Sequence, residues 1–122
     1  MKRLVGSLLL TFACLAATTC RADELAPTVD ETAYAEVAVE AHYFVAACSI
    51  YVEPADVLAF RRKFEGWVEG SPYEQAAWRA ADTQWREGVA DLNRHRFDKA
   101  ECGRLLADVL ADLRYAEARL SK

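Results

Sequence analysis

The sequence has only two histidines, and neither lies in a pattern typical of a metal site. His42 follows Glu40 by two residues, whereas di-iron helix bundles use a Glu-x-x-His spacing. His95 lies between Arg94 and Arg96, where we expect it to be solvated. The motifs for haem attachment and for a zinc protease are also missing from the sequence. We therefore expect no metal and no cofactor, and we expect His42 to face the edge of the fold.

The sequence also lacks a recognisable combination of a nucleophile, a base and an oxyanion site. Acidic pairs such as Asp108 and Asp112 are spaced to share one face of a helix. Such charges usually lie on the solvated side of an amphipathic helix. The sequence therefore does not predict an enzyme.

No hydrophobic run is long enough to favour a membrane-spanning helix, which needs about 20 predominantly apolar residues. The longest run covers residues 4–17, is interrupted by small and polar residues, and follows a basic pair at residues 2–3. A basic start, a short apolar run and small residues after it are typical of a bacterial secretory signal peptide. We therefore expect the chain to be exported.

We expect cleavage after Ala22, because Ala22 and Cys20 supply the small residues that signal peptidase prefers one and three positions before the cut. Residues 1–22 would then be the signal peptide, and residues 23–122 a single domain in the periplasm. The alternative is an outer-membrane lipoprotein attached through Cys20. Thr19 departs from the residues that usually precede a lipidated cysteine.

The expected mature chain has few basic residues, with 12 lysines and arginines against 19 acidic residues and a formal charge of −7. This charge argues against nucleic acid or an anionic membrane surface as a partner. Only two cysteines remain, Cys48 and Cys102. In an oxidising compartment they most simply form one disulfide, and two free packed thiols are the alternative.

Strand-like alternation is missing too, and four segments instead show the three- and four-residue spacing of amphipathic helices. Three of them start at a capping box, at Thr28, Ser71 and Asp98, and the fourth starts with Pro54 in the first helical turn. Gly88 indicates a close helix contact or a weak point, since glycine costs about 1 kcal/mol relative to alanine inside a helix. The expected core-facing residues are Tyr34, Val37, Ala41, Phe44 and Cys48, then Val57, Phe60, Phe64 and Trp67, then Ala77, Trp78, Ala81, Trp85, Val89 and Leu92, and finally Leu105, Leu106, Val109, Leu110, Leu113, Ala116 and Leu120.

Four helices with short links predict an all-α fold, a small antiparallel four-helix bundle with one disulfide. In such a bundle the first helix ends where the fourth begins, so Cys48 and Cys102 would meet. A disulfide across 54 residues would stabilise the fold by about 4 kcal/mol in the chain-entropy model. That is a large share of a net stability of about 5–15 kcal/mol.

The second and third helices carry more aromatic residues than a core of this size requires. Core packing can explain each of them singly. The alternative is an apolar groove that receives an amphipathic helix of a protein partner, since aromatic residues are favoured anchors of interfaces. The residues that would line this groove are Phe60, Phe64, Trp67, Trp78 and Trp85.

Most of the expected mature chain, from residue 34 to residue 115, resembles the GspS/AspS-type pilotins of the type II secretion system. The closest similarity is the stretch CGRLLADVLADL at residues 102–113. The other residues that carry the resemblance are Cys48, Tyr51, Pro54, Ser71, Tyr73, Asp91 and Leu92.

The resemblance implies a chaperone-like protein that binds the C-terminal helical segment of an outer-membrane secretin and assists its delivery and assembly. It implies no cofactor, no small-molecule substrate and no direct membrane contact unless Cys20 is lipidated. Two alternatives from other classes remain, a periplasmic immunity protein that neutralises a delivered toxin and a structural helical protein of the periplasm.

Overall fold

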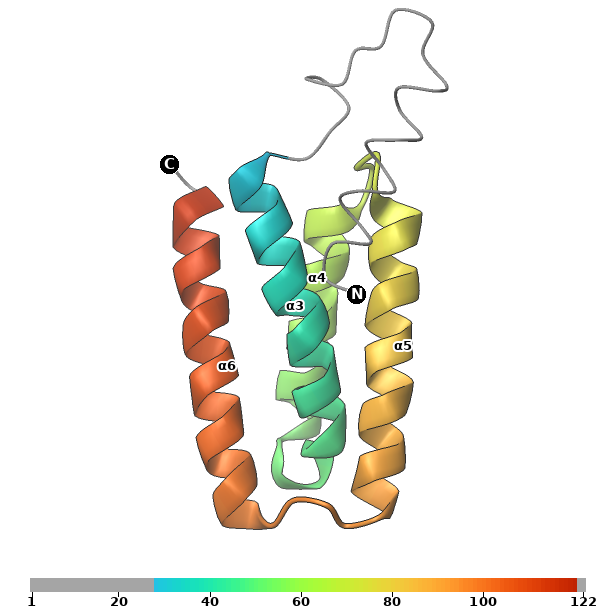
Figure 1. Ribbon diagram of the computed structural model, residues 1–122, viewed down its shortest axis with the longest axis vertical. Coiled ribbons are helices and arrows are strands. Elements are labelled where there is room, and N and C mark those ends of the chain that lie inside the picture. Colours follow the sequence, from blue (N-terminus) through green and yellow to red (C-terminus); the bar gives the residue numbers. More distant parts are fainter. Residues whose placement is uncertain (1–27, 121–122) are drawn as a thin grey trace, which may run out of the picture.

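The computed structural model describes residues 28–120, which form a four-helix bundle in which consecutive helices run in opposite directions (Figure 1). This confirms the predicted all-α fold. The predicted signal peptide, its cleavage site and Cys20 lie outside the described residues. No helix within residues 28–120 is long and apolar enough to cross a membrane. The elements are α3 (Val29–Ala47), the short 3-10 helix η1 (Ser49–Tyr51), α4 (Pro54–Val68), α5 (Glu74–Asn93) and α6 (Lys99–Leu120).

Two predicted capping boxes are present at the starts of α3 and α6. The backbone N–H of Glu31 donates to Thr28 Oγ1 at 3.1 Å, and the N–H of Thr28 donates to Glu31 Oε1 at 2.8 Å. At α6, the N–H of Glu101 donates to Asp98 Oδ1 at 2.8 Å, and the N–H of Asp98 donates to Glu101 Oε1 at 3.0 Å. Pro54 occupies the first turn of α4. These starts were predictable because the groups that make them are neighbours in sequence.

The predicted start of α5 at Ser71 is wrong, because the helix begins at Glu74. Glu74 Oε1 accepts from the backbone N–H of Gly70 at 2.9 Å rather than from that of Ser71. Gly70 has a φ of 78°, a left-handed conformation that favours glycine. The residues after it form a turn that places Tyr73 in the core, with its ring centroid 5.4 Å from that of Trp67. Because Tyr73 is buried in this turn, α5 begins at Glu74 and not at the start predicted from Ser71.

At its other end α5 closes with a Schellman motif, a standard helix C-terminus. The N–H of Arg96 donates to the carbonyl oxygen of Asp91 at 3.1 Å, and the N–H of His95 donates to that of Leu92 at 3.0 Å. His95 takes the left-handed position of this motif with a φ of 54°, where glycine is usual. Its side chain is exposed, as predicted.

Among the described helices, α3 lies close to both α5 and α6. Its buried surface is rich in alanine, which allows this approach. The predicted α3 face is therefore only partly right: Tyr34, Ala41 and Cys48 are buried, but Val37 and Phe44 are only partly buried. A helix packed on several sides buries a wider arc than one apolar stripe. The residues buried on α3 without having been expected there are Ala35, Ala38, His42, Val45, Ala46 and Ala47.

Cys48, after the last turn of α3, is joined to Cys102 in the first turn of α6 by a disulfide, as predicted. Their Cα atoms lie 5.6 Å apart and both side chains are fully buried. The bond closes the end of the bundle at which the α5–α6 connection also lies (Figure 1).

Candidate functional site

The aromatic residues predicted to form a groove lie on α4 and α5 and fall into two groups by their ring contacts. Phe60, Phe64, Trp78 and Trp85 surround one side chain, His42 of α3. The ring centroids of Phe60 and Phe64 lie 4.7 and 4.6 Å from that of His42. Those of Trp78 and Trp85 lie 6.3 and 6.4 Å away. We call these four residues and His42 the His42 cluster.

Trp67, the fifth predicted residue, belongs to another aromatic group nearer the opposite end of the bundle from the disulfide. Its ring centroid lies 4.4 Å from that of Tyr34 and 5.4 Å from that of Tyr73. Burial, and next to it the charge of Glu117, raise the pKa of Tyr34 to about 12. Burial, and next to it the charge of Glu31, raise the pKa of Tyr73 to about 12 as well. Both phenols are therefore neutral at physiological pH.

The five predicted residues differ in exposure. Phe64 is 1% exposed and belongs to the core, so a partner cannot reach it in this conformation. Phe60, Trp67, Trp78 and Trp85 are only partly buried. The aromatic residues therefore serve core packing, and four of them also keep some accessible surface.

His42 is fully buried, so the expectation that it faces the edge of the bundle is wrong. Its Nδ1 lies 2.7 Å from the carbonyl oxygen of Ala38, one turn earlier on α3. Its Nε2 has no hydrogen-bond partner among residues 28–120. Burial, as the largest cause, lowers the pKa of His42 to about 4, with the charge of Arg61 acting in the same direction. The imidazole is therefore neutral at physiological pH.

Arg61 of α4 covers the outer side of the His42 cluster. Its guanidinium carbon lies 4.5 Å from the ring centroid of Trp85 and 5.7 Å from that of Trp78. It also forms an ion pair with Asp82 of α5 at 3.3 Å. Arginine stacked on tryptophan contributes about 0.5–1 kcal/mol at exposed sites. These contacts connect α4 to α5 over the two tryptophans.

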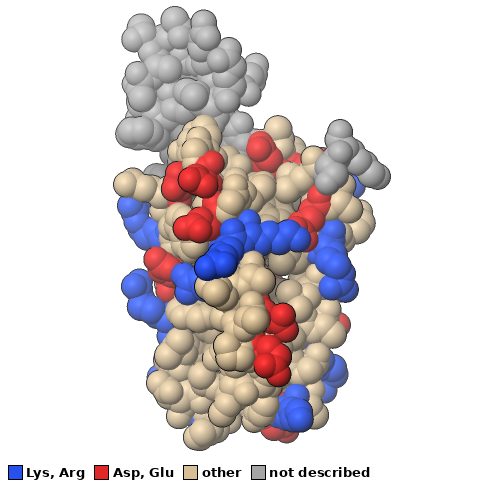
Figure 2. Space-filling model, turned by 180° about the vertical axis from the view of Figure 1, so that it is seen from behind, with Lys and Arg blue, Asp and Glu red and all other residues tan. Residues whose placement is uncertain are grey.

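Figure 2 shows the molecule from the side of α4. Basic side chains cross the middle of this face, acidic side chains lie above and below them, and much of the lower half is uncharged. Residues 61–63, in the middle of α4, are Arg-Arg-Lys. Near the start of α4, Ile50, Tyr51 and Leu58 are exposed. The face in Figure 2 therefore carries charges of both signs beside a broad uncharged area.

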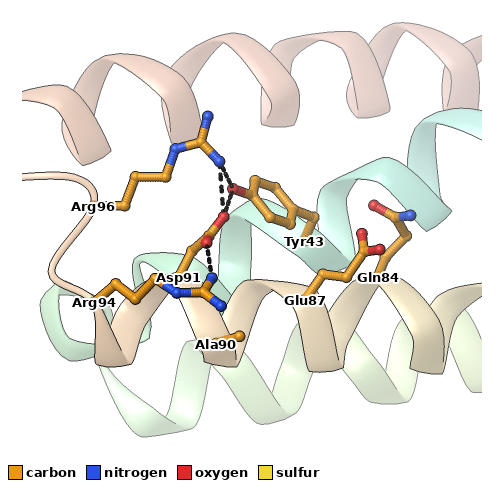
Figure 3. A pocket seen from close by; sticks show the side chains of 7 residues that line it. All are labelled: Tyr43, Gln84, Glu87, Ala90, Asp91, Arg94 and Arg96. Atoms are coloured by element: carbon orange, nitrogen blue, oxygen red, sulfur yellow. Dashed lines mark hydrogen bonds and ion pairs between the residues drawn. The ribbon is translucent and has the colours of Figure 1, made fainter.

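A second site, which the sequence did not suggest, is a polar hollow of about 600 Å³ beside α3, α5 and the α5–α6 connection (Figure 3). Asp91, one of its lining residues, accepts hydrogen bonds from three of the others. Tyr43 of α3 donates a hydrogen bond to Asp91 Oδ2, and Arg96 Nη1 donates to the same oxygen at 2.9 Å. Arg94 Nη1 donates to Asp91 Oδ1 at 2.8 Å. The hollow is lined by Tyr43, Gln84, Glu87, Ala90, Asp91, Arg94 and Arg96.

The groups in this hollow shift one another's pKa values. The hydrogen bond from Tyr43, followed by that from Arg96, lowers the pKa of Asp91. Burial, followed by the hydrogen bond to Asp91, raises the pKa of Tyr43 to about 12. One sequence signal was available: Asp91 lies one turn after Gly88 on the inward face of α5, and a buried acid requires partners. The arrangement holds the α5–α6 connection against α3.

The described part of the chain contains no group of three or more histidine, cysteine or acidic side chains that could hold a metal ion. Comparison with protein-family models, curated proteins and solved structures gave no match to this chain.

Proposed function

We propose that this protein is a non-catalytic, pilotin-like binding protein of the periplasm. Its partner is an amphipathic C-terminal helix of an outer-membrane secretin, whose targeting and assembly in type II secretion it assists. Export depends on the signal peptide at residues 1–22, and lipidation at Cys20 is the alternative means of reaching the outer membrane.

The observation that carries the proposal is the partial exposure of Phe60, Trp67, Trp78 and Trp85 on α4 and α5. A partner helix that covers them would bury large aromatic surfaces, which are the usual anchors of a helix bound in a groove. The disulfide-bonded four-helix fold is also what the resemblance to pilotins implies.

A synthetic secretin tail from the same cell tests the proposal. We expect it to quench tryptophan fluorescence saturably, and Trp67→Ala or Trp85→Ala to weaken binding at least about tenfold, since truncating a central aromatic commonly costs about 2 kcal/mol or more. Tyr115→Ala is the matched control, because Tyr115 is an exposed aromatic residue of α6. Far-UV circular dichroism must show that each variant remains helical.

Absence of binding by the wild-type protein to any secretin tail of that cell would contradict the proposal. Equal weakening by Tyr115→Ala would also contradict the assignment of the surface to α4 and α5. Recovery of a toxic effector as the bound partner would instead favour an immunity protein.

A further inference from the structure

His42 contacts the side chains of two other helices from a buried position on α3. It lies on α3, and its ring contacts Phe60 and Phe64 of α4 and faces Trp78 and Trp85 of α5. The side chain is fully buried. A change in its charge would therefore act on three helices at once.

The hydrogen bonds of His42 suit only the neutral ring. Nδ1 carries the proton, because it lies 2.7 Å from a carbonyl oxygen, which can only accept. Nε2 is then an acceptor, and no donor reaches it within residues 28–120. Protonation would turn Nε2 into a buried donor surrounded by aromatic rings. A buried charge without a partner is strongly unfavourable.

The charged groups around His42 do not compensate for this. Arg61 of α4 repels the imidazolium, while Asp82 of α5 attracts it. Asp82 is already paired with Arg61 at 3.3 Å. Arg61 also occupies positions over the rings of Trp78 and Trp85, which could otherwise stabilise a cation.

Of the helices that contact His42, α4 is the one held least firmly in the bundle. Within the described chain its fully buried side chains are Phe64 and Val68, and its N-terminus has no side-chain cap. By contrast, α3 is joined to α6 by the disulfide and packs closely on α5. The ion pairs of α4 with Asp82 and Glu117 involve partly exposed groups, which hold a helix only weakly.

We propose that His42 makes the bundle acid-sensitive, so that protonation of its imidazole releases α4 from α3 and α5 while the disulfide keeps α3 and α6 together. The open form uncovers the aromatic side chains of α4 and α5. This acid-induced opening does not depend on the proposed secretin partner, because it is a property of the bundle alone.

The direction of the pH effect follows from the lowered pKa of His42, about 4 in the bundle against 6.5 for a free imidazole. The open state takes up the proton more readily, so the closed state is fully favoured above about pH 6.5 and loses this advantage as the pH falls to 4. A difference of this size shifts the opening equilibrium by up to about 300-fold.

Amide hydrogen exchange on the disulfide-bonded protein tests this, at pH 7 and pH 4.5 and corrected for the intrinsic exchange rate. We expect acid to reduce protection of α4 by about ten- to 100-fold, with little change at the α3–α6 contact. His42→Phe, which keeps a ring of similar shape, should keep α4 protected at pH 4.5. His95→Asn, at the exposed histidine, should respond to acid as the wild type does.

Unchanged protection of wild-type α4 at pH 4.5 would overturn the proposal, as would an equal loss in His42→Phe. A second measurement covers the case in which His42→Phe does not fold. The imidazole of His42 can be titrated by NMR in the His95→Asn protein, where it gives the only histidine signal. A pKa at or above 6.5 would overturn the proposal, and a pKa near 4 would support it.

Discussion

Gly88 of α5 lies against the backbone of Tyr43 of α3, so that a Cβ at Gly88 would overlap the Tyr43 carbonyl oxygen and lie 2.7 Å from the Cβ of Ala46. Neither neighbour is the flexible end of a side chain, so the two helices would have to separate. The sequence left two explanations for Gly88 open, and this contact selects the close approach.

We therefore expect Gly88→Ala to lower the free energy of unfolding by about 1–2 kcal/mol, because overpacking exceeds the gain in helix propensity. Urea denaturation measures this. Gly103→Ala in α6 is the matched control, since apart from its chain neighbours and the adjacent backbone of its own helix no atom of the described chain lies within 4 Å of where its Cβ would be. The control should gain about 0.5–1 kcal/mol. An equal gain in Gly88→Ala would show that α3 and α5 are not in close contact there.

Replacing both Cys48 and Cys102 by alanine should destabilise the protein by about 2–5 kcal/mol, as is typical of small secreted domains. Both sulfur atoms are fully buried at the end of the bundle where α3 and α6 meet. Thermal unfolding with and without reductant measures the effect. Thiol labelling of unfolded, unreduced protein should find neither cysteine reactive, and two reactive thiols per chain would contradict the bond.

His95→Gly should stabilise the protein by up to about 1 kcal/mol. His95 holds the left-handed position at the end of α5, with a φ of 54°, and glycine adopts this conformation without a steric penalty. Part of the gain is lost because glycine has more freedom in the unfolded chain. Chemical denaturation compares this variant with His95→Ala, which keeps the strain and should gain nothing. Equal stability of the two variants would contradict the helix end described above.

Sequence reasoning succeeded where the interacting groups are close along the chain. The capping boxes at Thr28 and Asp98 involve residues three apart, and the disulfide followed from an alternating order of helices. It failed at Ser71, where burial of Tyr73 overrides the local start signal. It also failed at His42, because α3 packs on several sides and buries residues outside its expected face.

The candidate sites also depend on contacts between helices, which the sequence did not predict. Composition and spacing identified the five aromatic residues on α4 and α5, but not that four of them surround His42 while Trp67 packs elsewhere. The polar hollow joins Tyr43 to Asp91, 48 residues further along the chain. Such a contact depends on how the helices are rotated about their axes, which one sequence does not reveal.

Mass spectrometry of the exported protein should find Asp23 as the first residue. The expected cleavage after Ala22 rests on the small residues Cys20 and Ala22 before the cut. A matched variant, Ala22→Leu, should slow processing, because a large side chain no longer suits the position before the cut. A diacylated Cys20 at the mature terminus would overturn this prediction and establish a lipoprotein.

The last prediction concerns Tyr43, whose hydroxyl donates to Asp91 beside Arg96. Tyr43→Phe removes this donor from a partly buried carboxylate, so the free energy of unfolding should fall by about 1 kcal/mol. Tyr115→Phe, at an exposed residue of α6, should change it by less than about 0.5 kcal/mol. Tyr43→Phe should also raise the pKa of Asp91, because the Tyr43 hydrogen bond is the largest cause of its lowering. NMR titration of the Asp91 carboxyl carbon measures this, and an unchanged pKa would show that Arg94 and Arg96 hold the carboxylate without Tyr43.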